Sequence, residues 1–178
     1  YSDIGRAFGA QMVDISIGSK THINLLDLPD LDRLDDEDDD PIGDKANLLM
    51  GLFESILSEV TDAQIGIIDR VTGMTYERYL TDHYTPTLKE WHQVLKEQPE
   101  PEAQDLALAV ETYTTGSQDI FAHNTNVDLN HRFVIFNLKK LSHKLKPFAL
   151  MVIQDYIWNQ IVENQGKCTT WVYFDEMQ

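Results

Sequence analysis

Cysteine is almost missing from these 178 residues, and Cys168 stands alone. A single cysteine excludes an internal disulfide and a cysteine-cluster metal site, and it fits a reducing compartment such as the cytosol. The six histidines lack metal-ligand spacing, so each is interpreted as a surface or packing residue. No apolar run approaches the ~20 residues that span a bilayer, and no leader pattern is present. We therefore expect a cytoplasmic segment, soluble as it stands, that reaches a membrane only through partners.

Basic residues are also few: 14 Lys and Arg against 30 Asp and Glu give a formal net charge of -16. Binding of nucleic acid by counterion release requires the opposite sign, so we expect no direct nucleic-acid binding. The acids concentrate between Asp27 and Asp44, where Pro29, Pro41 and Gly43 also oppose a packed element. This stretch is interpreted as a mobile, solvated loop. It lacks the ligand pattern of an EF-hand, so no specific calcium binding is expected.

After the acidic stretch, apolar residues recur at spacings of three and four, which predicts a helical unit over residues 44 to about 122. Its first helix is expected to begin near Asp44. A capping box of Thr87 and Glu90 predicts the start of a later helix, and the Pro99 and Pro101 pair ends that helix. Trp91 and Trp158, like the tyrosines at helical spacing, are core candidates.

In three short segments the apolar residues no longer follow helical spacing. These segments predict strands near residues 11–15, 132–137 and 169–174. The runs RFVIFNL and TTWVYF are apolar without polar alternation, as expected of strands covered on both faces. A helix of about twenty residues, from about Lys144 to Asn164, separates the last two strands. This βαβ unit implies a parallel sheet with a right-handed crossover.

The predicted fold class is therefore α/β, with part of a parallel sheet and a predominantly helical inserted domain. Residues 1–28 begin the sheet, residues 29–127 hold the acidic loop and the helical domain, and residues 128–178 return to the sheet.

Two acids, Asp175 and Glu176, directly follow the apolar residues 171–174. In open α/β sheets, ligands bind at the carboxyl ends of the strands. In a nucleoside triphosphatase, Asp175 would help to hold Mg²⁺, usually through water, because this hard cation prefers oxygen ligands. Glu176 would orient and polarise the attacking water as general base. The alternative interpretation is a pair of solvated acids at a strand end.

The phosphate-binding loop of such an enzyme is not found in these residues. The tetrapeptide GSKT begins at Gly18, but the pattern GxxxxGK[ST] requires glycine where the chain has Ser19 and Asp14. If the chain belongs to an ATPase, its phosphate loop is expected upstream of Tyr1.

A series of segments resembles, in the same order, the stretch between Walker A and Walker B in type IV secretion ATPases of Gram-positive conjugative elements. These segments are YSDIGRAFGAQMVDIS, HINLLDL, YTPTLKEW, YTTGSQDIFAHNTNVDL, RFVIFNLKKL, KPFALMVIQDYIWNQI and TTWVYFDEMQ. The similarity covers nearly the whole chain. Its most specific parts are Asn24 in HINLLDL, Asn126 and Asp128 in FAHNTNVDL, and the terminal YFDE.

The resemblance implies a RecA-like motor core interrupted by an all-helical domain. It implies that the full-length parent uses ATP and Mg²⁺ to power channel assembly and substrate passage in type IV secretion or conjugative DNA transfer. Asp175 matches the position that holds the cofactor and its metal, and Glu176 matches the catalytic position. The implied partners are other type IV secretion components at the inner membrane face, and the implied oligomer is a hexamer.

Some assignments stay open at this point. Gln178 stands where many relatives have histidine, so no role of that histidine is carried over. The loop with Asn126 and Asp128 either contacts the nucleotide site or braces the return into the sheet. The alternative to a motor fragment is an autonomous helical protein-interaction domain whose terminal acids do no catalysis.

Overall fold

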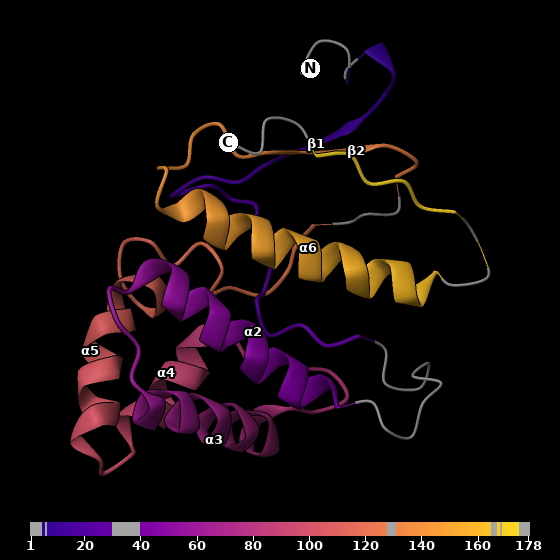
Figure 1. The fold of residues 1–178 in the computed structure, drawn as a ribbon. Coiled ribbons are helices and arrows are strands. Elements are labelled where there is room, and N and C mark those ends of the chain that lie inside the picture. The colour runs from indigo at the N-terminus through magenta and orange to yellow at the C-terminus, as the bar shows by residue number, and fades with distance from the viewer. Residues whose placement is uncertain are drawn as a thin grey trace.

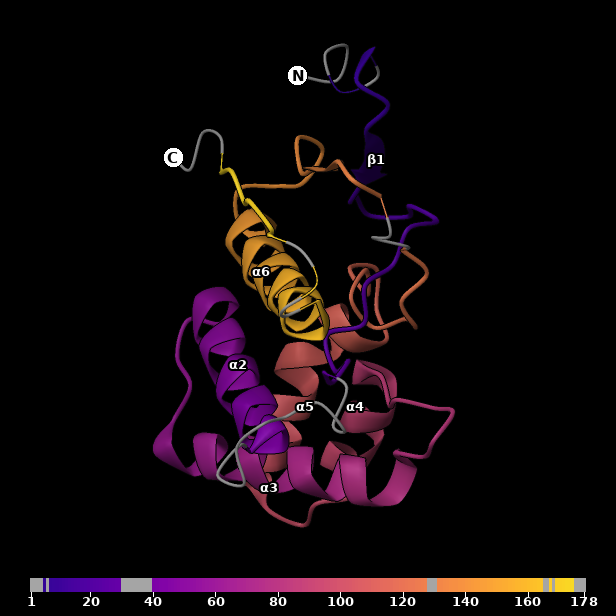
Figure 2. The same ribbon diagram turned by 90° about the vertical axis from the view of Figure 1, so that its right-hand side faces the viewer.

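The structure, a computed structural model, describes residues 5, 7–29, 40–127, 131–164, 167 and 169–174. Its elements are, in order, β1 (Gln11–Asp14), α2 (Pro41–Ile56), α3 (Asp62–Tyr79), α4 (Leu88–Lys96), α5 (Pro101–Thr114), β2 (Val134–Asn137) and α6 (Leu145–Glu163). Helix α6 lies between the unit formed by α2–α5 on one side and the two strands on the other (Figures 1 and 2). The chain is therefore mostly helical, with a small sheet at one end.

The two strands pair in parallel, with Gln11 opposite Val134 and Asp14 opposite Asn137. They confirm the strands predicted near 11–15 and 132–137. The connection between them contains all four helices of the unit, which makes it far longer than an ordinary βαβ crossover. Two segments distant in sequence are thereby placed side by side, and both strands end at the same edge.

The third predicted strand, residues 169–174, is not formed. The side chains of Trp171 and Tyr173 are 77% and 85% exposed, whereas the sequence predicted a strand covered on both faces. A strand requires a backbone partner, and β1 and β2 pair only with each other in the described part of the chain. An apolar, β-branched composition cannot supply that partner, so the prediction was wrong for these residues.

Helix α2 begins at Pro41, earlier than the predicted start near Asp44. Asp40 is its N-cap residue, and the Asp40 side chain accepts a hydrogen bond of 2.9 Å from the backbone N–H of Gly43. Proline is favoured in the first helical turn, where its missing N–H needs no partner. The interpretation of Pro41 as a residue that opposes packed structure was therefore wrong. The remainder of the acidic stretch, residues 30–39, lies outside the described residues.

Side-chain caps fix the starts of the next helices. The predicted capping box of Thr87 and Glu90 is confirmed at the start of α4, and a second box joins Thr61 and Gln64 at the start of α3. The apolar faces of the helices meet in one core. Its fully buried side chains include Leu49, Phe53, Ile68, Val71, Trp91, Leu95, Leu106 and Val110. Trp91 packs against Phe53 and donates a 3.0 Å hydrogen bond from Nε1 to Thr72 Oγ1, so the core prediction for Trp91 is confirmed.

Helix α6 covers the core from the side of α2. Phe148, Val152 and Ile153 are buried on this face, whereas Trp158 is 62% exposed on another. The core prediction for Trp158 was wrong because the helix is apolar around most of its circumference, and the helical unit covers only one side of it. Within the described ranges, no helix combines the length and the apolar character needed to cross a bilayer.

Candidate functional site

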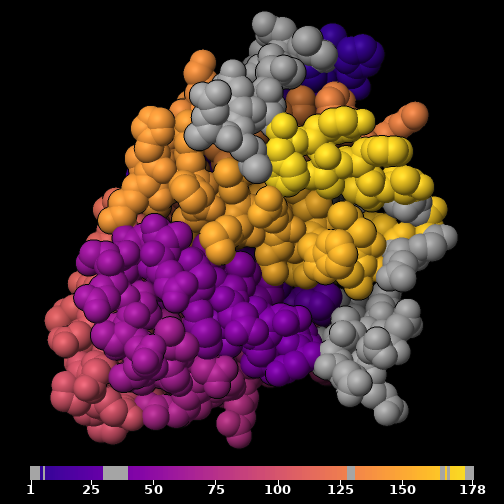
Figure 3. Space-filling view, viewed as in Figure 1, coloured from indigo at the N-terminus to yellow at the C-terminus, as the bar shows by residue number. Residues whose placement is uncertain are grey.

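The acids that the sequence singled out, Asp175 and Glu176, lie outside the described residues, as do Asp128, Cys168 and Gln178. The described segment that leads to the two acids, residues 169–174, lies on the same side of α6 as the strands. In the space-filling view this segment forms part of the molecular surface (Figure 3). The assignment of a catalytic role to Glu176 and a metal-binding role to Asp175 therefore stays a prediction.

Polar side chains gather at the carboxyl ends of the two parallel strands. Asn137 donates a hydrogen bond of 2.6 Å from Nδ2 to Asp14 Oδ1, and its Oδ1 accepts one of 3.2 Å from the backbone N–H of Lys139. This edge is where ligands bind in open α/β sheets. Neither residue was predicted from the sequence to belong to a site. A signal was available, because both polar residues end apolar strand patterns.

Asn24 holds three segments of the chain together. Its side chain is buried, donates from Nδ2 to the backbone oxygen of Pro86 at 2.9 Å, and accepts at Oδ1 from the N–H of Leu26 at 3.1 Å. Its backbone N–H donates to Thr125 Oγ1 at 2.7 Å. Because both ends of the amide are engaged with backbone, Asn24 fixes the exit from β1 against the helical unit.

Asn126, in the segment between α5 and β2, braces the same region. Its Nδ2 donates to the backbone oxygen of Lys20 at 2.7 Å, and its Oδ1 accepts from the N–H of His22 at 2.8 Å. A side-chain amide bound in this way acts as a substitute for a backbone pairing partner. Asn126 was expected either to contact the nucleotide site or to brace the return into the sheet. These hydrogen bonds support the bracing role.

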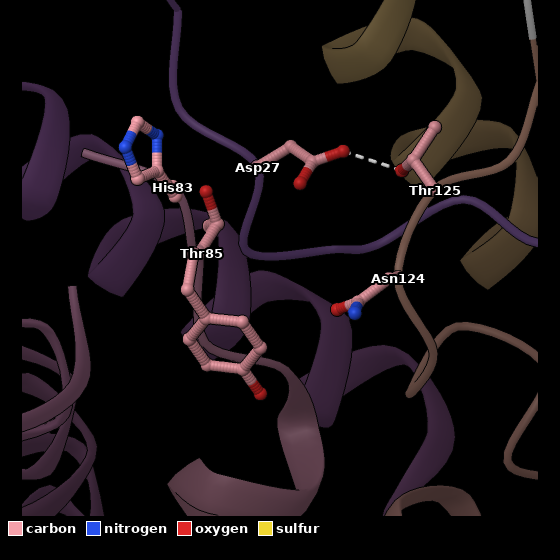
Figure 4. A pocket seen from close by; sticks show the side chains of 6 residues that line it. Asp27, His83, Thr85, Asn124 and Thr125 are labelled. Atoms are coloured by element: carbon pink, nitrogen blue, oxygen red, sulfur yellow. Dashed lines mark hydrogen bonds between the residues drawn. The ribbon is translucent and has the colours of Figure 1, made fainter. Parts of the chain in front are cut away.

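A polar pocket opens between these braced segments. Its cavity volume is about 230 Å³, and its lining residues are Asp27, His83, Tyr84, Thr85, Asn124 and Thr125. In Figure 4, Asp27 lies between His83 on one side and Thr125 on the other, and a hydrogen bond joins Asp27 to Thr125. Burial raises the pKa of the Asp27 carboxyl above its ordinary value, although the hydrogen bond from Thr125 works in the opposite direction.

A buried ion pair lies near the pocket. Lys45 of α2, which is 3% exposed, pairs with Asp155 of α6. Burial raises the pKa of the Asp155 carboxyl, and the charge of Lys45 opposes this shift. Tyr76 donates a 2.7 Å hydrogen bond to the backbone oxygen of Leu26, and burial raises the pKa of its phenol. The junction of β1, the helical unit and α6 is thus held by buried polar contacts.

Two histidines, His22 and His123, are in contact near this junction, with ring centroids 4.4 Å apart and the ring planes tilted by 37°. His123 Nε2 lies 2.9 Å from Asp119 Oδ2, and Lys89 Nζ lies 3.3 Å from the same oxygen. Across the ranges that the structure describes, no three His, Cys, Asp or Glu side chains are arranged to hold a metal ion. The contacts that the structure gives these two histidines are their ring contact and, for His123, the polar contacts with Asp119 and Lys89.

The prediction that Asp27 belongs to a solvated acidic stretch was wrong, because Asp27 is half-buried and hydrogen-bonded to Thr125. Its neighbours in sequence, Leu25 and Leu26, are fully buried, and Asp27 itself makes a turn with Asn24 through a 3.3 Å backbone hydrogen bond. The apolar residues before Asp27 were a usable sign that the carboxylate lies at the edge of the core.

Comparisons with known proteins give a fold. No model of a protein family matches the chain, and no curated protein matches its sequence. Among solved structures, the chain is similar to the structure of VirB4 of Thermoanaerobacter pseudethanolicus, with a TM-score of 0.75 and 18% sequence identity. The similarity covers 92% of this chain and 47% of that chain, so the chain spans about half the length of VirB4. The strands and the helical unit are thus consistent with part of a VirB4-like α/β fold.

Proposed function

We propose that this chain is the portion between Walker A and the end of Walker B of an ATPase that powers type IV secretion or conjugative DNA transfer. The observation that carries the proposal is the fold shared with VirB4 over 92% of the chain. An identity of 18% relates only the folds of the two chains. The order of sequence segments, which resembles that of type IV secretion ATPases, is a separate line of support.

In this proposal Asp175 and Glu176 act at the carboxyl edge of the sheet. Their donor set fits Mg²⁺ and ATP, because carboxylate oxygens suit a hard cation and a glutamate can accept a proton from water. Mg²⁺ supplies neutralisation of the phosphate charge. Asp175 would hold the ion through water, and Glu176 would orient the attacking water and accept its proton. The phosphate loop would lie upstream of Tyr1 in the parent protein.

The helical unit is, in this proposal, the domain inserted into a RecA-like motor. Residues 1–28 and 128–178 would belong to the motor, and residues 29–127 would form the acidic loop and the insert. The parent would assemble as a hexamer on the cytoplasmic side of the membrane and contact other secretion components there. The bracing amides of Asn24 and Asn126 support a fixed junction between insert and motor.

The experiment that tests this function compares the parent protein with the 178-residue chain. The parent should carry GxxxxGK[ST] within the ~100 residues before Tyr1, bind ATP with Mg²⁺ and release phosphate. The 178-residue chain alone should neither bind ATP tightly nor release phosphate, because the loop pattern is absent from its sequence. Steady phosphate release by the isolated chain, above a Glu176→Ala control, would contradict the proposal. So would a parent without the loop.

A second function has an observation of its own. Helices α2–α5 supply much of the apolar core, as a helical interaction domain would, although Val13 of β1 and the buried face of α6 belong to the same core. Under this alternative the terminal acids do no catalysis. A parent protein that neither binds nor hydrolyses ATP would favour it over the motor.

A further inference from the structure

We propose that the pocket beside Asp27 is a binding site for a basic side chain, above all the guanidinium of an arginine on an exposed segment of a partner protein. This inference stands apart from nucleotide hydrolysis, because none of the lining residues belongs to the proposed catalytic pair.

The pocket is built from three distant parts of the chain that buried hydrogen bonds hold in place. Asn24 joins its own segment to Pro86 and to Thr125, and Thr125 in turn donates to the Asp27 carboxylate. The opposite wall is a tight turn in which Thr81 and Tyr84 exchange backbone hydrogen bonds of 3.0 and 3.2 Å. The walls are therefore preorganised, which limits the ordering that a ligand must cause on binding.

The charge of the pocket selects the ligand. Asp27 is the one acid among the lining residues, and no lysine or arginine lines the pocket. The nearby ammonium of Lys45 is already paired with Asp155. The charge of Lys45 therefore offsets that of Asp27 only in part. A phosphate or carboxylate ligand would be repelled by the Asp27 carboxylate, whereas a cation would be attracted, and the net charge of -16 adds to that attraction.

The hydrogen-bonding groups favour a planar cation with several donors. Thr125 engages Asp27 Oδ2, and each carboxylate oxygen can accept more than one hydrogen bond, so the group keeps capacity for a guanidinium. The side chains of Asn124, His83 and Thr85 have no hydrogen-bond partner within the described residues. Their amide, ring and hydroxyl can accept further N–H groups. Burial removes water from around the Asp27 carboxylate, and this raises its pKa. A bound cation would stabilise the charged carboxylate in place of that water.

Size and exposure point to a side chain carried by a protein. A volume of about 230 Å³ is below the ~300–1,000 Å³ of sites for drug-sized ligands, so the pocket suits a single side chain better than a whole nucleotide. A divalent ion is disfavoured because a single carboxylate lines the pocket and no metal-binding group of three was found in the described ranges. His83 and Asn124 are exposed at the rim, where the segment that carries the arginine could rest.

The test is an NMR titration of the 178-residue chain at physiological salt with the capped tripeptide Gly-Arg-Gly. Gly-citrulline-Gly, which has the same shape without the charge, is the matched ligand. We expect saturable shifts of the amides of residues 83–85 and 124–125 with the arginine peptide, and at least ~10-fold weaker binding of citrulline. Asp27→Asn should weaken arginine binding by at least about tenfold, whereas Asp105→Asn, an exposed acid on α5 that changes the net charge equally, should not.

A second variant protects the test against a folding defect. Asn124→Leu keeps Asp27 and its bond to Thr125 but fills the rim, and it should also block the peptide. Equal binding of citrulline, unchanged binding by Asp27→Asn, or shifts spread over the acidic surface without saturation would each overturn the inference. Methylguanidinium that binds as tightly as the tripeptide would overturn the assignment to a protein partner, because flanking backbone would then contribute nothing.

Discussion

The helical unit and the sheet part of this chain differ in how fully they bury apolar side chains. Within α2–α5, Leu49, Phe53 and Trp91 are all 0% exposed. In the sheet part, every residue of β2 is only half-buried, and the residues from Trp171 to Phe174 are between 40% and 85% exposed. The residues that stabilise the fold and those proposed to act in catalysis therefore lie mainly in different regions of the chain. The helical unit holds much of the core, to which Val13 of β1 and the buried face of α6 also contribute, whereas β2 and residues 171–174 lead toward the proposed catalytic acids.

The largest effect is expected from a core substitution in the helical unit. Trp91→Ala removes a buried ring, its contact with Phe53 and its hydrogen bond to Thr72, so the free energy of unfolding should fall by about 3–5 kcal/mol. Urea denaturation followed by circular dichroism measures it. Trp158→Ala is the matched control and should stay within about 0.5 kcal/mol, because that ring is 62% exposed. Equal losses in the two variants would break the comparison.

The next effect concerns the junction of the two regions. Asp155→Asn leaves the buried ammonium of Lys45 without a counter-charge, and we expect a loss of about 3 kcal/mol in the free energy of unfolding. The double variant Lys45→Met/Asp155→Leu should be more stable than Asp155→Asn and recover most of that loss, because two apolar side chains leave no unpaired charge. If Asp155→Asn alone changes nothing, the ion pair does not hold α2 to α6.

A smaller effect should appear with pH. Burial lowers the pKa of His92, whose Nε2 donates 2.9 Å to the backbone oxygen of Ala107. The unfolded chain therefore binds a proton more readily, so the free energy of unfolding should decrease as pH falls through ~6.5, the ordinary histidine value. The raised pKa values of Asp27 and Asp155 have the opposite sign, since protonation then favours the folded state.

The variant His92→Gln separates the contribution of His92 to the pH dependence from that of the two carboxyls. Glutamine keeps an N–H donor for the backbone oxygen of Ala107 but does not titrate. Denaturation curves at about pH 7.5 and about pH 5.5 should show a larger loss of stability in the original chain than in the variant. An identical pH dependence in both would show that His92 is not a source of it.

The smallest effect is expected in the sheet part. Asn137→Ala removes the 2.6 Å hydrogen bond to Asp14 between the strand ends, where Asn137 is half-buried and the bond lies at the surface. The loss should be about 0.5 kcal/mol, at the low end for a hydrogen bond. Denaturation curves measure it, and a loss as large as that of Trp91→Ala would contradict the division between the two regions.

The sequence was informative where local chemistry decides structure. Capping at Thr87, the apolar faces of the helices and two of the three strands depend on residue types at fixed spacing, and they were predicted. The start of α2 at Pro41 is local, because Asp40 caps the helix and proline suits its first turn, so the sequence held that signal although it was not used. The partial burial of Asp27 and the exposure of Trp158 depend on contacts between distant segments, which spacing does not reveal. The same holds for residues 169–174, because composition favours a strand but cannot provide its neighbour.

The measurement that tests the central claim most directly is ATP turnover by the parent protein with Glu176→Gln. The substitution keeps the size and reach of the side chain but removes its ability to accept a proton. ATP binding should survive, while phosphate release should fall by ~10²–10⁴-fold. Asp175→Asn should instead weaken the affinity for Mg²⁺-nucleotide as well. Turnover of Glu176→Gln at the original rate would show that Glu176 is a solvated acid and that the motor assignment of these residues is wrong.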